Sequence, residues 1–180
     1  MKNLILVSAV LAGTIGAMAQ GTINFNNRVT AVGLDQPVTY NGAKLDGAAY
    51  LGQLYVGATA GSLAPVGVAV EFRGGAAAGY INGGTVTLTG VAAGSTVFAE
   101  VRAWEASGGN TYELAVTKAA AGKSETFQIV GLGGPVAGQP DAFPANMTNF
   151  KSFSLVAIPE PSTVALGLLG AVSLLAFRRK

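Results

Sequence analysis

The segment Ser95–Glu105 reads STVFAEVRAWE, and its pattern decides the fold class. Side chains of two kinds alternate along it, which is the two-residue period of a β-strand. One predicted face carries Val97, Ala99, Val101 and Ala103, and the other carries Phe98, Glu100, Arg102 and Trp104. The segment therefore predicts a strand that turns one face toward a core.

The same alternation recurs on both sides of this segment. TINFN from Thr22 and TVTLTG from Thr85 repeat it, and further strands are predicted at 36–40, 50–57, 66–72, 111–116, 125–131 and 151–158. Turn residues separate them, at Asn41-Gly42, Asp46-Gly47, Asn82-Gly83-Gly84 and Gly108-Gly109-Asn110. About nine short strands at this spacing predict an all-β fold, a β-sandwich or jelly-roll.

One internal stretch shows no alternation. Residues 131–149 contain Pro135, Pro140 and Pro144, and a loop of this length in a compact domain is either a packed crossover or a functional surface. Of these two, the packed crossover is favoured.

Composition limits the classes of protein and of partner. Charged residues make up only 11% of the chain, and four of its 11 bases lie at the two ends, which leaves the middle nearly neutral. Nucleic-acid binding is not expected, because no basic patch is left to neutralise phosphates. The chain has no Cys, so a single core of about 140 residues must hold the body together without disulfides.

The first twenty residues read MKNLILVSAVLAGTIGAMAQ and have the parts of a secretory signal peptide. Lys2 supplies the positive region, an apolar stretch follows, and Ala17 and Ala19 form a small-x-small cleavage site. We expect residues 1–19 to be removed by signal peptidase after export through the general secretory machinery. The mature chain then begins at Gln20.

Residue types exclude much of catalysis. The chain has no His and no Cys, so Ser-His-Asp triads, thiol nucleophiles and zinc sites of imidazole or thiolate are absent. A carboxylate pair for glycoside hydrolysis could come only from scattered acids, with Glu100, Glu105 and Glu113 as candidates. The favoured interpretation is a solvated Glu100–Arg102 pair, and no enzyme activity, catalytic residue, metal or cofactor is predicted.

Trp104 is the single tryptophan and shares a predicted strand face with Glu100 and Arg102. An exposed aromatic ring beside hydrogen-bonding groups can stack on a sugar, so these three residues are a candidate glycan site. The alternative, which is favoured, is that Trp104 covers an edge of the core.

The last 22 residues read PEPSTVALGLLGAVSLLAFRRK. Pro159 and Pro161, on either side of Glu160, favour an extended backbone. Residues 162–177 are uncharged and predict a helix of about 24 Å, close to the thickness of a bilayer core. The bases that follow, Arg178, Arg179 and Lys180, predict a cytoplasmic carboxyl end and therefore an amino end outside. A permanently anchored single-pass protein is an alternative interpretation.

In order, spacing and terminal position, these three parts resemble the PEP-CTERM sorting signal of exosortase substrates. The resemblance implies a Gram-negative exported protein that is held briefly in the inner membrane and handed to an exosortase, an integral-membrane processing enzyme. It further implies surface display and association with exopolysaccharide or biofilm matrix. The segments GTINFNN and VRAWEASGGNTYELA also resemble PEP-CTERM proteins of verrucomicrobial genomes, whose bodies have no assigned activity.

The predicted organisation thus has three parts. Residues 1–19 are a signal peptide, residues 20–158 a β-sandwich-like extracellular domain, and residues 159–180 the sorting signal. The leading function is that of a non-catalytic surface or matrix protein, and the alternative is a carbohydrate-binding module.

Overall fold

The structure is a computed structural model that describes residues 20–136 and 138–158. Its longer strands are β1 (Gln20–Asn26), β6 (Tyr50–Gly57), β7 (Ala64–Glu71), β8 (Asn82–Thr89) and β9 (Val97–Glu105). Shorter strands are β2 (Arg28–Val29), β3 (Leu34–Asp35), β4 (Thr39–Tyr40), β5 (Ala43–Lys44), β10 (Ala121–Lys123), β11 (Phe127–Ile129), β12 (Ala145–Asn146) and β13 (Ser154–Leu155). One helical turn, α1 (Tyr112–Ala115), and four 3₁₀ turns at 30–32, 47–49, 75–77 and 106–108 connect them.

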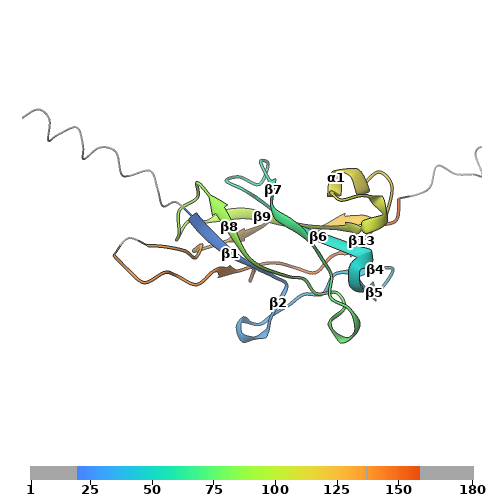
Figure 1. The fold of residues 1–180 in the computed structure, drawn as a ribbon, viewed down its shortest axis with the longest axis horizontal. Coiled ribbons are helices and arrows are strands. Elements are labelled where there is room, and N and C mark those ends of the chain that lie inside the picture. Colours follow the sequence, from blue (N-terminus) through green and yellow to red (C-terminus); the bar gives the residue numbers. More distant parts are fainter. Residues whose placement is uncertain (1–19, 137, 159–180) are drawn as a thin grey trace, which may run out of the picture.

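Two larger sheets pack face to face (Figure 1). One has the order β12-β1-β8, and the other has the order β10-β9-β6-β7 with β11 also paired to β9. Apart from the parallel β1–β12 pair, the pairings in these two sheets are antiparallel. The all-β prediction is confirmed, in the form of a sandwich.

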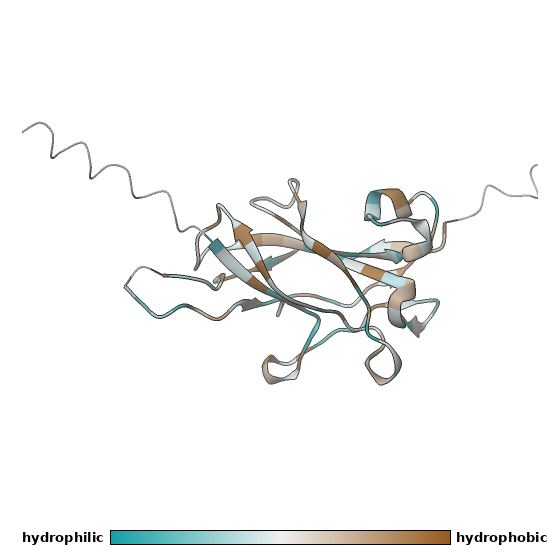
Figure 2. Cartoon of the chain, in the orientation of Figure 1, coloured by the Kyte–Doolittle hydropathy of each residue, from teal (hydrophilic) through white to brown (hydrophobic). Residues whose placement is uncertain are grey.

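A single main core lies between the two sheets. Strand β1 supplies Ile23 and Phe25 from one sheet, and Leu54 of β6 and Val101 of β9 come from the other, all at most 1% exposed. Apolar residues recur along the strands of both sheets in Figure 2. Alternation therefore places one side of each main strand in the core, as the sequence predicts for β1, β8 and β9.

A buried asparagine fastens the loops at one end of the sandwich. The Asn27 amide is 1% exposed and donates to the carbonyls of Gln36 (2.7 Å) and Gly79 (3.0 Å). Its carbonyl oxygen accepts from the amide of Ile81 (2.7 Å). This one side chain joins three segments in place of the disulfide that the chain lacks.

The segment 131–149 is largely a packed crossover, as predicted. Leu132 and Met147 are buried, Thr22 and Gly133 exchange backbone hydrogen bonds, and β12 extends the first sheet. Phe143, in contrast, is 92% exposed, directly after Ala142, which pairs with Gly134.

Two local predictions are wrong. Residues 111–116 are not a strand, because Thr111 caps α1 by accepting the amide of Leu114 (3.4 Å). The predicted turn at Asn82-Gly84 lies inside β8, where the register with β1 shifts near Gly84, whose φ is +69°. Both segments contain local signals, a helix cap and a bulge glycine, that alternation does not distinguish.

Candidate functional site

The second face of β9 carries the chemically richest cluster of the described residues. Strand register places Tyr55 of β6 opposite Glu100, and places Lys123 of β10 opposite Arg102. Above this face, the connection after β9 folds back through α1 and brings Tyr112 and Glu113 over the sheet. The candidate site is therefore assembled from three neighbouring strands and one helical turn.

Four charged side chains form what we call the ion network: Glu100, Arg102, Glu113 and Lys123. Arg102 Nε donates to Glu100 Oε1 at 2.6 Å, and its Nη1 donates to Glu113 Oε1 at 3.1 Å. Lys123 Nζ donates to Glu100 Oε2 at 3.2 Å. Each Glu100 oxygen thus has a cationic donor, so both oxygens of a carboxylate whose side chain is only 4% exposed have hydrogen-bond partners.

Arg102 also stacks on aromatic rings. Its guanidinium carbon lies 3.8 Å from the centroid of the Tyr55 ring and 5.1 Å from that of Tyr112. Burial alone would lower the pKa of Arg102, but the hydrogen bond and attraction to Glu100 raise it. Burial, together with the bond from the Tyr55 hydroxyl to Glu113, raises the pKa of Tyr55 to about 12.

Trp104 is not exposed, so the interpretation of this face as a sugar-stacking platform is wrong. The indole is 0% exposed, its Nε1–H donates to the carbonyl of Gly109 at 2.9 Å, and Tyr112 packs edge-on at 6.2 Å between centroids. Ala115 of α1 belongs to the same buried cluster. The alternative, that Trp104 packs against a core, is correct, but Trp104 belongs to a second, smaller core and not to the main one.

The expected solvated pair of Glu100 and Arg102 is instead largely shielded from solvent, with side chains 4% and 19% exposed. The structure brings together all three predicted glycan residues, but under α1 and without an exposed ring. Sequence reasoning missed Lys123 as a member of this cluster, and it considered Glu113 only as one of several scattered acids. The Thr111 cap, followed by an acidic first turn, is the signal that would have placed a helix over this face.

The arrangement of carboxylates does not resemble a hydrolytic pair. Both oxygens of Glu100 are held by cations, and Glu113 accepts from Arg102 and from the Tyr55 hydroxyl. A general acid or nucleophile must instead face a bound substrate. The ion network thus acts as a clamp that holds α1 and β10 onto β9.

The predicted processing residues lie mostly outside the described residues. This holds for Ala17 and Ala19, for Pro159, Glu160 and Pro161, for the helix predicted at 162–177, and for Arg178, Arg179 and Lys180. Gln20 is described, and it is the first residue of β1. Within residues 20–136 and 138–158, no helix has the length and apolar character needed to span a bilayer.

At the other end, the chain is paired until shortly before the predicted sorting signal. Strand β13 runs parallel to β4, and Val156 exchanges two backbone hydrogen bonds with Ala121, at 3.0 and 3.2 Å. Ala157 and Ile158 then lie beyond the last pairing. The folded body and the signal therefore adjoin without a long linker.

Comparison with known proteins identifies this carboxyl-terminal segment. A family model described as the PEP-CTERM protein-sorting motif matches residues 157–180. Neither the curated proteins nor the solved structures gave a match to the chain. The chain thus carries a PEP-CTERM protein-sorting motif, which indicates an exported, cell-surface protein that is targeted to an exosortase.

Proposed function

We propose that this chain is a non-catalytic surface or extracellular-matrix protein whose carboxyl end is cut by an exosortase. The observation that carries the proposal is the sorting motif at residues 157–180, directly after the last paired residue, Val156. The protein is then itself the substrate of the processing step, and its sandwich is the part that is displayed.

The position of the motif supports a short tether. Five residues separate Val156 from Ser162, where the predicted span begins, and an extended chain spans about 3.3 Å per residue, so the tether reaches only about 20 Å. A body held this closely cannot move far from the membrane surface. Pro159 and Pro161 favour an extended backbone, which is the form in which proteases take up a strand.

Membrane retention before cutting is the second step of the proposal. Residues 162–177 contain no charged residue, and the cationic Arg178, Arg179 and Lys180 stop transfer and stay in the cytoplasm. A span of this length is short, but snorkelling of the bases and local thinning of the bilayer compensate at modest cost. With the signal peptide, these features support an inner-membrane intermediate with the amino end outside.

Association with exopolysaccharide or biofilm is the least direct part of the proposal. It is supported by the resemblance to other proteins that carry this sorting signal, which are associated with exopolysaccharide or biofilm matrix. A non-catalytic role is supported by the ion network, in which the buried Glu100 is fully engaged by cations.

Mass spectrometry of the mature protein tests the processing steps. We expect an amino end at Gln20 and a carboxyl end between Pro159 and Ser162. A mature protein that retains Arg178–Lys180 would refute cutting and favour the permanently anchored alternative.

A matched pair of variants tests the role of the motif. Replacing Pro159 and Pro161 together by alanine should leave the uncut protein in the inner-membrane fraction. Pro140→Ala, at an exposed position of the 131–149 segment, should be processed normally. Equal processing of both variants would show that the two prolines have no role in recognition.

A further inference from the structure

The first sheet has a free edge at β8. Among the described strands, β8 pairs only with β1, and β1 lies between β8 and β12. Strand β7 is the edge of the opposite sheet on the same side of the sandwich, near β8 (Figure 1). Both sheets therefore end at this side of the molecule.

The backbone groups of the β8 edge point outward at every second residue. Thr22 of β1 exchanges hydrogen bonds with Gly133, at 2.9 and 3.1 Å, on the side of β1 that faces away from β8. Thr87 is the register partner of Thr22. Since the backbone groups of Thr22 are bonded to Gly133, Thr22 and Thr87 do not hydrogen-bond each other. The N–H and C=O of Thr87 therefore face the free edge. The same alternation applies to Thr85 and Thr89, because the register shift lies beyond them.

From Thr85 to Thr89, this edge lacks the devices by which monomeric proteins block pairing. Residues 74–99 contain no Lys, Arg, Asp or Glu, and the side chains of Thr85, Thr87 and Thr89 are exposed and small. Natural edges are usually blunted by charges, prolines or bulges. Strand β7 has such devices, with Pro65 and an irregular register between Gly52 and Leu54 of its partner strand, whereas β8 has none from Thr85 to Thr89.

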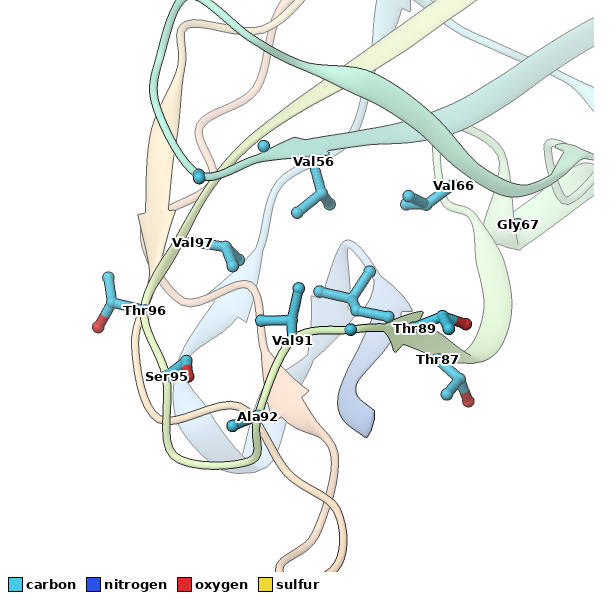
Figure 3. A pocket seen from close by; sticks show the side chains of 14 residues that line it. Val56, Val66, Gly67, Thr87, Thr89, Val91, Ala92, Ser95, Thr96 and Val97 are labelled. Carbon is cyan, nitrogen blue, oxygen red and sulfur yellow. The ribbon is translucent and has the colours of Figure 1, made fainter. Parts of the chain in front are cut away.

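An uncharged groove opens beside the same edge. It has a volume of about 670 Å³ and is lined by residues of β6, β7, β8 and the turn before β9. Val56, Val66, Val91 and Val97 point into it in Figure 3, whereas Thr87 and Thr96 point away. No residue of its lining carries a charge, so a partner that covers it needs no ionic complement.

We propose that the β8 edge binds a second copy of this chain by antiparallel strand pairing centred on Thr87. A twofold axis at Thr87 places Thr85 opposite the second copy's Thr89, and Thr89 opposite its Thr85. The three pairs each exchange two hydrogen bonds, about six in all. Because both edges are uncharged, their approach meets no like-charge repulsion, and the cross-strand threonine pairs are favourable. The two small sheets then form one continuous sheet across the dimer.

Sedimentation velocity of the full chain in a density-matched detergent tests this interface. The wild type is expected to dimerise as its concentration rises. Thr87→Lys places two ammonium groups at the axis, and should weaken dimerisation by roughly ten-fold or more. Thr126→Lys adds the same charge at an exposed position next to β11, which pairs with β9 on the side of the second sheet opposite β7, and should leave dimerisation unchanged.

A charge exchange tests the register itself. Thr85→Lys with Thr89→Lys opposes like charges in both outer pairs and should abolish dimerisation. Thr85→Glu with Thr89→Lys opposes unlike charges in both pairs and should restore it. These side chains are exposed, and Trp104 fluorescence confirms that each variant is folded.

Three results would overturn the proposal. The first is a wild-type protein that stays monomeric at high concentration. This includes the case in which another protein or a glycan covers the β8 edge. The second is dimerisation that all edge variants retain, which would place the contact elsewhere, for example in residues 159–180. The third is failure of the charge-exchanged variant to dimerise while folded. None of these results bears on exosortase processing, which is measured separately.

Discussion

Replacing Arg102 by methionine should destabilise the sandwich strongly, because the substitution leaves the buried carboxylate of Glu100 without its nearest cationic partner. Glu100 is 4% exposed at its side chain and would lose its 2.6 Å partner, leaving only Lys123, whose side chain is 56% exposed. Removing one partner of a buried pair costs about 3–5 kcal/mol. Loss of the stacking of Arg102 on Tyr55, at 3.8 Å, contributes about 0.5–2 kcal/mol of destabilisation in the same direction.

The free energy of unfolding can be measured by urea denaturation with Trp104 as the reporter. Trp104 is the single tryptophan and is fully buried two residues from Arg102, so its emission follows the unfolding of this region. Lys151→Met is the matched control, because Lys151 and Glu125 form an ion pair at 3.8 Å with side chains 77% and 83% exposed. Such an exposed pair is worth only about 0–1 kcal/mol.

A double substitution distinguishes the cost of an unpaired buried charge from the cost of lost packing. Glu100→Leu combined with Arg102→Met removes both buried charges, and should recover most of the stability that Arg102→Met alone loses. Lys123 is then free to be hydrated. The reasoning is refuted if Arg102→Met costs no more than the Lys151 control, or if the double variant is less stable than Arg102→Met.

Two further predictions concern other parts of the body. Since the pKa of Tyr55 is raised from 10.0 to about 12, the folded state holds its proton more tightly than the unfolded state between these values. Stability should therefore be intact below pH 10 and fall by roughly 1–3 kcal/mol as the pH rises to 12, with a smaller fall in Tyr55→Phe, as measured by urea denaturation at each pH. Asn27→Leu should cost about 2–4 kcal/mol, because it leaves the buried groups of Gln36, Gly79 and Ile81 without their partner, and thermal unfolding that matches the wild type would contradict this.

Long strands were predictable because the two-residue alternation of apolar and polar side chains repeats several times along them. Residues 50–57 form β6 as predicted, and the predicted strand at 95–105 contains β9. Of the short strands, β4 and β13 lie inside the strands predicted at 36–40 and 151–158 but have only two residues each, whereas β2, β3, β5, β10 and β12 were not predicted. Parallel pairing of β13 with β4, and of β12 with β1, is a tertiary effect that no local pattern records.

The candidate site shows a different limit. Alternation along β9 correctly separates its two faces, but it does not say which face is covered. The sequence favoured a Trp104 that covers an edge of the core over one on an exposed face, but it did not indicate that α1 covers this face or that Trp104 packs with Ala115 and Ala121 in a second cluster. The covering element was assigned as a strand because TYELAV also alternates, and only the Thr111 cap distinguishes the two structures.

The two proposals use opposite ends of the molecule. In Figure 1 the described chain ends beside α1 and β13, whereas β8 and the start of β1 lie at the far end of the long axis. A body tethered to a membrane through residues 157–180 therefore keeps the β8 edge directed away from its anchor. Pairing at β8 does not require that the tail be cut, so uncut Pro159→Ala, Pro161→Ala protein should dimerise as the wild type does. If that uncut protein were monomeric while the mature form dimerised, the tail would control the edge, and the two features could not be independent.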